Sequence, residues 1–388
     1  MPQEHKAQRR ASLPHARPTT AIQGPAPSGL VEQAPVTLID ASPGFEKAHP
    51  PSRGMAARVH SSILKERIRI RALGLANRFR VIRTIDVAVA CFAERPFKAA
   101  LTAAQRAMRG LVKDELLRRY RTDRFQTVYG LTGSGVAWLE ERDIDAVASI
   151  RRVSDMSNPE HRLWAQFVTL CSEVRGLRAY TEQELLLLLA DEERPAQGLL
   201  SVSIHMSRGE RKLELRPDAA AVEADGVTWF EVDRSPRGAD RAASLRALIL
   251  AMGRNTRLGE PLRRVIVLTR TPRIQNRVLA TLDALVRDSK NFSLMERRRV
   301  LMPCGPDAYE VTCTQEEVLR DGRTRLVDSL AGHVIVQPLP VWLPKVRMDG
   351  RGGHAVDGWF DENYLPYRRL PSMQAWSVPS SPLLHPPA

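Results

Sequence analysis

The stretch from Leu213 to Asp233, LELRPDAAAVEADGVTWFEVD, constrains the fold more than any other part of the sequence. Two runs of strand-forming residues flank Asp225-Gly226. A two-residue Asp-Gly loop strongly favours a β-hairpin, because both central positions of a type I′ turn require φ > 0. We therefore expect an antiparallel hairpin that turns at Asp225-Gly226.

The expected turn sets a register with these pairs: Ala224 with Val227, Ala220 with Glu231, and Asp218 with Asp233. Opposed residues share one face of a sheet, and side chains alternate along each strand. Asp218, Glu231 and Asp233 are therefore expected on one face, where three carboxylates repel one another unless a cation or basic groups compensate. Such hard oxygen ligands suit Mg²⁺ or Mn²⁺. A register slip of one residue would break this arrangement.

These residues carry a family resemblance. Pro217-Asp218, followed thirteen residues after the aspartate by Glu231-Val232-Asp233, resembles the PD-(D/E)xK pattern of restriction-endonuclease-like proteins. In active nucleases of that pattern the Asp and Glu hold the metal ion and the Lys helps to activate water. The resemblance implies Asp218 and Glu231 as metal ligands, with Asp233, in place of the lysine, as a third ligand or an acceptor that orients water. Because Asp cannot supply the positive charge of Lys, the resemblance leaves activity open.

The ExD version of the pattern, after an N-terminal winged helix, resembles the bacterial replication-relaxation family of plasmids and mobile elements. The resemblance covers roughly residues 60 to 270. It implies a role in replication, relaxation or mobilisation, with a relaxase or a replication protein as partner. The alternative for the acidic residues is a solvated strand face without a site.

The charge of the chain favours a polyanionic partner. The 388 residues carry a formal charge of +14, with a pI near 10.2, and 43% are hydrophobic. This length and composition are those of a globular protein with two domains and tails. Four cysteines without a CxxC pair indicate reduced thiols. No apolar run is long enough for a membrane helix or a secretion signal, so we expect a cytoplasmic protein.

The expected organisation is a mixed α/β (α+β) fold in two domains. Its parts are a disordered basic arm over 1–58, a winged helix-turn-helix over 59–142, a linker over 143–160, a PD-(D/E)xK nuclease-like domain over 161–340, and an irregular extension over 341–388. In the extension, aromatic side chains either pack on the core or stack on nucleotides. From Ser377 onward we expect a disordered tail.

The region 59–142 predicts helices near Ile63–Leu73, Thr84–Phe92 and Thr102–Leu116, then a basic hairpin over Leu117–Leu131 and a closing helix after Gly135. This order looks like a winged helix-turn-helix. Residues 58–142 hold 18 basic and 8 acidic residues, so they carry +10 of the net charge. The candidates for reading base edges, on the polar face of the third helix, are Gln105, Arg106, Arg109 and Lys113. The phosphate candidates in the hairpin are Arg119, Arg121 and Arg124.

The region from residue 161 predicts an α/β core compatible with the restriction-endonuclease fold. His161 opens a helix and is either a neighbour of the acidic face or an ordinary helix-end histidine. Thr181 and Glu184 form a capping-box pattern. The further expected helices are 240–252 and 274–286, and the expected strands besides the hairpin are 199–205, 212–215, 264–269, 300–302 and 334–337.

Three functions are compatible with these features. The first is a DNA-binding protein of a bacterial mobile element, in which Asp218, Glu231 and Asp233 bind Mg²⁺ or Mn²⁺ if the nuclease-like site is active. The second is a degenerate nuclease fold that serves as a scaffold or dimerisation module. The third is a transcriptional regulator, which would form a homodimer on a palindromic site.

Overall fold

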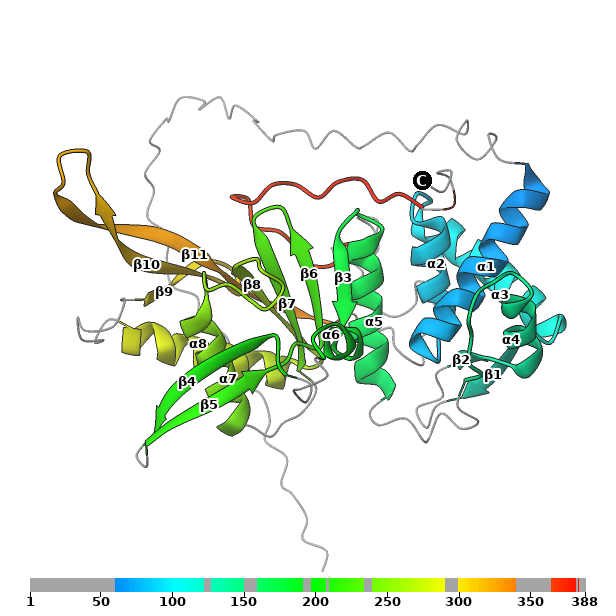
Figure 1. Cartoon of the computed structure of the whole chain (residues 1–388), viewed down its shortest axis with the longest axis horizontal. Helices are drawn as coiled ribbons and strands as arrows, with labels where there is room; N and C mark the ends of the chain where they lie inside the picture. The colour runs from blue at the N-terminus through cyan, green and yellow to red at the C-terminus, as the bar shows by residue number, and fades with distance from the viewer. Residues whose placement is uncertain are drawn as a thin grey trace, which may run out of the picture. The chain divides into compact units, whose positions relative to one another are not determined.

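The structure is a computed structural model, and it describes residues 60–121, 127–149, 159–190, 197–206, 209–233, 239–289, 299–339, 364–381 and 383. The predicted arm over residues 1–58 lies outside these residues. Helices and strands alternate along the described part, which confirms the mixed α+β class (Figure 1). Within the described residues, no helix combines the length and apolarity needed to cross a membrane.

Residues 60–149 form what we call the helical unit. Its elements are α1 (Ser61–Phe79), α2 (Thr84–Phe92), α3 (Phe97–Lys113), β1 (Leu117–Arg121), β2 (Thr127–Leu131) and α4 (Gly133–Glu140). The predicted start of α3 at Thr102 is wrong, because the helix begins after Pro96 in its N-cap position. Thr102 lies inside the helix, and its hydroxyl donates to the carbonyl of Lys98.

The two strands of the helical unit pair antiparallel from Leu117↔Leu131 to Arg121↔Thr127. Thr132 then caps α4, with its hydroxyl accepting from the N–H of Gly135 at 3.0 Å. A side chain at Gly135 would place its Cβ 2.3 Å from the carbonyl oxygen of Leu116. A glycine is therefore needed where α4 passes the start of β1.

The second part of the chain is built on a seven-stranded mixed sheet, which we call the sheet unit (residues 159–339). The strand order is β3-β6-β7-β8-β11-β10-β9, and β8 is parallel to both of its neighbours. The other neighbouring strands are antiparallel. The strands are β3 (Arg178–Thr181), β6 (Ala219–Glu223), β7 (Gly226–Asp233), β8 (Leu262–Thr269), β9 (Arg299–Gly305), β10 (Ala308–Val318) and β11 (Thr324–Pro338).

Four helices and a separate hairpin complete the sheet unit (Figure 1). The helices are α5 (Pro159–Glu173), α6 (Glu182–Leu188), α7 (Ala239–Ala251) and α8 (Pro272–Ser289). The strands β4 (Leu200–Met206) and β5 (Gly209–Leu215) pair only with each other among the described strands. Helix α5 begins two residues before the predicted His161. The capping box of Thr181 and Glu184 at α6 is confirmed.

The central strands are buried on both faces. Along β7, Phe230 and Val232 join a core cluster with α5, whereas Val227 and Trp229 join a second cluster with α7 and α8. This division follows from the alternation of side chains along a strand. The continuous apolar run in β8 has the same cause, because a strand covered on both faces has no polar side.

The helical unit shares its core with the sheet unit. Phe92 of α2 and Phe167 of α5 belong to the same buried cluster. A buried ion pair between Arg83 and Asp86 adds polar contacts, with Nη2 of Arg83 2.7 Å from Oδ1 of Asp86. Nη2 of Arg83 also donates to the carbonyl of Leu163 at 2.5 Å, and the amide of Gln166 donates to Asp86 at 2.8 Å. The residues between Ser149 and Pro159 are therefore not the sole connection between the units.

The predicted hairpin of β6 and β7 is present, but its predicted register is wrong by two residues. Val222 faces Val227, and Glu223 faces Gly226, so that the turn is at Ala224-Asp225. Gly226 has a φ of +139°, and a Cβ there would lie 2.3 Å from the carbonyl oxygen of Pro261. The glycine thus permits the close approach of β7 to the segment before β8 and is not the second turn residue.

The C-terminal segment contains buried residues, so the predicted disordered tail from Ser377 is wrong for the described residues 377–381 and 383. Ser381 is fully buried, and its hydroxyl donates to the carbonyl of Cys91 at 2.9 Å. Arg67 donates to the carbonyl of Leu383 at 2.9 Å. Tyr364 and Tyr367 are also fully buried, as expected if the aromatic side chains pack on the core. Trp342, Trp359 and Phe360 lie outside the described residues.

The buried ion pair at the junction of the units generates a first prediction. Replacing Asp86 with Ala leaves the guanidinium of Arg83 buried without its carboxylate partner. We expect a loss of about 3–5 kcal/mol in the free energy of unfolding, measured by urea denaturation. The control is Asp114→Ala, because the ion pair of Asp114 with Arg69 is more exposed than that of Asp86 with Arg83. We expect this change to lower the free energy of unfolding by less than about 1 kcal/mol. Equal losses in the two variants would contradict this explanation.

Candidate functional site

Helix α3 presents a polar face to solvent. Gln105, Arg106, Arg109 and Lys113 are all exposed. The opposite face of the helix is buried through Ala104, Met108 and Leu111. The structure thus brings the four predicted base-reading residues together on one side of a helix whose other side is fixed in the core. The Nε of Arg109 donates to the carbonyl of Gln105 at 3.2 Å, which directs this side chain back along the helix.

Strand β1 adds basic side chains within the same unit. Arg118, Arg119 and Arg121 are exposed, whereas Leu117 at the start of the strand is buried. The guanidinium of Arg118 lies 5.8 Å from the ring centroid of Tyr120. Two predicted phosphate-binding residues, Arg119 and Arg121, are therefore accessible, and the third, Arg124, lies outside the described residues. We call the exposed residues of α3 and β1 the basic surface.

The carboxylate of Asp218 lies just before β6 and is held by donors from two elements. Its Oδ2 accepts from the backbone N–H of Val232 at 2.5 Å, and its Oδ1 is 2.9 Å from Nε2 of His161. Of the two alternatives considered for His161, the structure therefore places this residue beside the acidic group. Helix α5 carries His161 on the sheet face that contains Phe230 and Val232.

Glu231 is held on the other face of the sheet. Its Oε1 accepts from the indole N–H of Trp229 at 2.7 Å, and Trp229 packs in the cluster with α7 and α8. In the observed register Phe230 is paired with Ala219. The next position of the ladder therefore sets the backbone of Glu231 opposite Asp218. The predicted pair of Asp218 with Asp233 is wrong. The backbone of Asp233 pairs with Thr269 of β8, and the side chain of Asp233 lies outside the described atoms.

Asp218 and Glu231 both carry hard oxygen ligands of the kind that Mg²⁺ prefers. Among the side chains that the structure describes, no three His, Cys, Asp or Glu residues gather as a metal site. The contact of Asp218 with His161 and the contact of Glu231 with Trp229 lie on opposite faces of the sheet, so the predicted common face of these two carboxylates is not observed.

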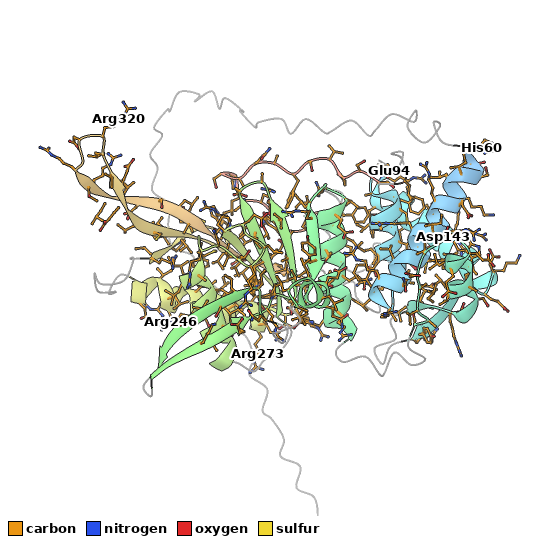
Figure 2. The ribbon with its side chains drawn as sticks, in the orientation of Figure 1. His60, Glu94, Asp143, Arg246, Arg273 and Arg320 are labelled. Atoms are coloured by element: carbon orange, nitrogen blue, oxygen red, sulfur yellow. The ribbon has the colours of Figure 1, made fainter. Side chains whose placement is uncertain are left out.

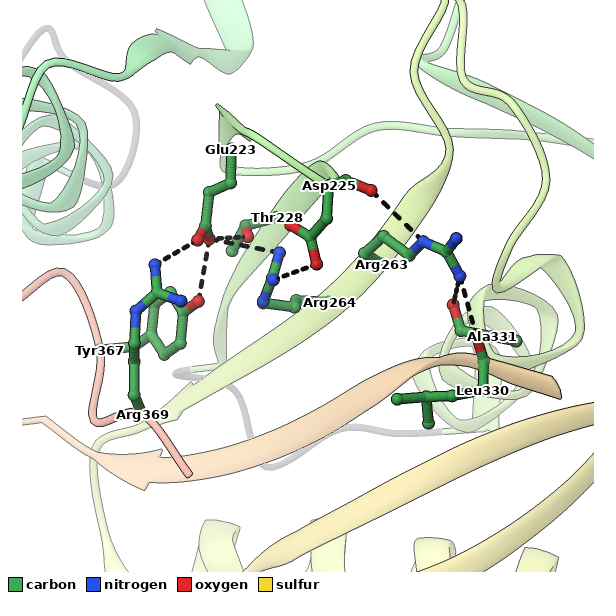
Figure 3. Close-up of polar contacts among 9 residues, drawn as sticks. All are labelled: Glu223, Asp225, Thr228, Arg263, Arg264, Leu330, Ala331, Tyr367 and Arg369. Carbon is green, nitrogen blue, oxygen red and sulfur yellow. Dashed lines mark hydrogen bonds and ion pairs between the residues drawn. The ribbon is translucent and has the colours of Figure 1, made fainter. Parts of the chain in front are cut away.

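A second polar cluster lies at the opposite end of the hairpin, and the sequence analysis missed it. Glu223 is buried at the end of β6 and accepts hydrogen bonds from the hydroxyls of Thr228 and Tyr367 (Figure 3). Arg264 of β8 lies between Glu223, at 3.6 Å, and Asp225, at 2.5 Å. Burial alone would raise the pKa of Asp225, but the hydrogen bond and charge of Arg264 outweigh it and lower this pKa.

This cluster fixes the C-terminal segment on the sheet. Arg369 forms an ion pair with Glu223, beside the hydrogen bond that Glu223 accepts from Tyr367. Burial, reinforced by the charge of Glu223, raises the pKa of Tyr367, which therefore keeps its proton as a donor. The sequence contained a signal for this cluster: Arg264 opens an otherwise apolar run, and a buried charge requires a partner.

We searched for similar proteins among protein-family models, curated proteins and solved structures. No family model, no curated protein and no solved structure matches this chain.

His333 provides a prediction about pH. It is paired with Arg264 in the sheet, and burial, together with the charge of Arg264, lowers its pKa from the usual 6.5, against the opposite influence of Glu310 and Asp225. The unfolded chain therefore binds a proton at a higher pH than the folded chain. We expect the free energy of unfolding to fall as the pH decreases from about 6.5, by up to about 1.4 kcal/mol per pH unit from this group.

The measurement is urea denaturation at a series of pH values from 7.5 to 5.5, chosen to span the ordinary histidine pKa of about 6.5. His333→Gln removes the titrating group and should make the decrease in stability less steep. An unchanged slope in this variant would show that other groups cause the acid destabilisation.

Proposed function

We propose that the protein binds duplex DNA through the basic surface of α3 and β1. The observation that carries this proposal is the exposure of Gln105, Arg106, Arg109 and Lys113 on one face of a helix that is anchored by its opposite face. An α-helix fits the major groove of B-DNA, where Arg and Gln side chains can form paired hydrogen bonds with guanine and adenine edges.

The elements around α3 support a docking mode of the winged-helix type. Three helices precede a two-stranded antiparallel sheet, and the exposed Arg119 and Arg121 lie on its first strand. In this mode the helix reads bases while the strand arginines bind phosphates and fix the register on the duplex. The alternative for such a surface, contact with another protein, is less consistent with the concentration of positive charge in this unit.

The resemblance to the replication-relaxation family supports a role for this DNA binding in a bacterial plasmid or mobile element. We propose replication, relaxation or mobilisation as the process and a relaxase or replication protein as the partner, in the cytoplasm. The competing proposal is a non-enzymatic regulator or scaffold that uses the same basic surface.

The test of DNA binding compares two arginines of the basic surface by fluorescence anisotropy on labelled duplexes. Arg121→Ala should weaken binding to all sequences and reduce the slope of log K against log salt by about one, because one phosphate contact is lost. Arg106→Ala should reduce the preference for the favoured sequence by about 1–3 kcal/mol.

The matched control is Arg323→Ala, which removes an exposed arginine from the sheet unit. Its affinity and salt dependence should equal those of the parent. If both Arg106→Ala and Arg121→Ala bind like this control, the basic surface does not bind DNA.

A second candidate function is metal-dependent cleavage of DNA at Asp218 and Glu231. The supporting observation is the strand order β3-β6-β7-β8 in the sheet, in which two antiparallel pairs are followed by a parallel pair. Helix α5 precedes β3, and α7 lies between β7 and β8 in the chain. Asp218 stands directly before β6, and Glu231 lies near the end of β7, as the PD-(D/E)xK resemblance requires.

In that function one of the two side chains would leave its present contact and turn toward the other, so that Asp218 and Glu231 would together hold Mg²⁺ or Mn²⁺. Asp233 would be a third ligand or an acceptor for water. The ion would supply a water molecule of lowered pKa and charge stabilisation at the scissile phosphate. The protein's own contribution is to fix the two carboxylates, through Val232 and His161 for Asp218 and through Trp229 for Glu231. Asp233 brings no positive charge to replace the lysine.

A nicking assay on supercoiled plasmid with Mg²⁺ or Mn²⁺ decides between cleavage and binding alone. Cleavage by the parent that is lost in both Asp218→Ala and Glu231→Ala, with DNA affinity unchanged, supports the nuclease. Glu182→Ala, which removes a half-buried carboxylate at the start of α6, serves as the control and should cleave like the parent. Intact binding without cleavage by the parent would instead select the regulator or scaffold.

A further inference from the structure

Strands β10 and β11 continue beyond their neighbours as a two-stranded ribbon. β10 pairs with β9 only as far as Cys313, and β11 pairs with β8 only from His333 onward. Among the described strands, residues 314–332 therefore have no third partner. We call these residues the arm, and Arg320 marks its tip (Figures 1 and 2). An isolated two-stranded ribbon is at best marginally stable in water, which indicates a surface that becomes covered.

One face of the arm carries three exposed apolar side chains. The register places Val318, Leu326 and Leu330 on this face, where they are 70%, 67% and 48% exposed. Glu316 and Asp328 lie between them on the same face. On the other face Arg325 and Glu317 form an ion pair at 2.7 Å. Several large exposed apolar side chains on one small ribbon indicate an interaction surface.

The charge of the arm argues against a nucleic acid as its partner. The arm holds three basic residues and four acidic residues, in a chain of net charge +14: Arg320, Arg323 and Arg325, with Glu316, Glu317, Asp321 and Asp328. Two copies of a strongly basic protein repel each other over most of their surfaces. The arm is a region where two copies can meet without this repulsion.

The backbone of the arm determines which residues can bind a further strand. The N–H of Leu319 donates to the carbonyl of Arg323 at 2.7 Å. In an antiparallel ladder, hydrogen-bonded and non-hydrogen-bonded pairs alternate. Thr324, Leu326 and Asp328 consequently direct their N–H and C=O groups away from β10, toward the free edge of β11.

The geometry points to a homodimer in which β11 pairs antiparallel with β11 of a second copy, centred on Leu326. This register sets Leu326 against its own copy and Thr324 against Asp328 of the other chain. A register centred on Val327 would set Leu326 against Asp328, and one centred on Asp328 would oppose two carboxylates. Self-pairing of β10 is disfavoured because Glu316 and Glu317 of both copies would meet.

The dimer brings the exposed apolar side chains of both copies together. The twofold axis of such a pair is perpendicular to the sheet, so Val318, Leu326 and Leu330 of both copies lie on the same side. Two marginal two-stranded ribbons become one four-stranded sheet, which is more stable than either ribbon alone. This interface is independent of the basic surface and of Asp218 and Glu231.

The first experiment measures the oligomeric state of the full chain by sedimentation velocity over a range of micromolar concentrations. The parent should be a dimer, and Leu326→Lys should raise the dissociation constant at least about tenfold, since a lysine at an edge opposes strand pairing. Leu187→Lys, at a leucine of α6 that is 79% exposed, should leave the dimer intact. The proposal is overturned if the parent is a monomer, even one whose arm binds another protein. It is also overturned if the Leu326→Lys variant remains a dimer.

The second experiment tests the register with a short bismaleimide cross-linker in a Cys304→Ser background, which removes the exposed native thiol. Leu326→Cys should form a covalent dimer, because the two introduced thiols face each other across the axis. Leu330→Cys should not, since the register places its two copies roughly 26 Å apart along the strands. Equal cross-linking of both variants, or none at position 326, would refute this register.

Discussion

The burial of helix α5 on all sides is the constraint on which the rest of the structure depends. From Leu163 to Ser172 every side chain of this helix is buried. One side covers the sheet through Phe230 and Val232, and another contacts the helices of the N-terminal region. A helix that is covered all round has no solvated face. Here the helical unit and the sheet unit together provide that cover.

This arrangement affects how the basic surface is presented. The core that contains Phe92 and Phe167 joins the helical unit to the sheet unit, and the polar contacts of Arg83, Asp86 and Gln166 add directional bonds at the same junction. Hydrogen bonds among buried charged groups require defined geometry. Helix α3 is therefore held in a fixed orientation with respect to α5.

The sequence predicted the element types well where local chemistry determines them. The apolar spacing in α3, the capping box at Thr181 and the β-branched run of β8 all identified their elements. The missed strand β10 contains Glu310, Glu316 and Glu317, and glutamate is depleted in strands. Its pairing with β11 is a tertiary effect that a local pattern does not contain.

The candidate site was also predicted only in part, because tertiary contacts determine part of its geometry. A register error of two residues keeps every strand residue on its face, so the predicted common face of Trp229 and Glu231 is correct. Asp218 lies before β6 and bonds to Val232 and His161, which the strand pattern did not predict. The register prediction is wrong because it treats Gly226 as a turn residue. A glycine is needed at this position because the carbonyl of Pro261 leaves no room for a side chain. The roles of Glu223 and Arg264 depend on Tyr367 and Arg369, which are too distant in the chain for local patterns to connect them.

The placement of the C-terminal segment has a consequence for how the molecule is assembled. Ser381 bonds to Cys91 across 290 positions of sequence, and Arg369 reaches Glu223 across 146. Contacts of such long range form slowly, because the intervening chain must first be ordered. During synthesis these bonds cannot form until residues 369 to 381 have left the ribosome. Until then both units lack the contacts that the C-terminal segment makes with them.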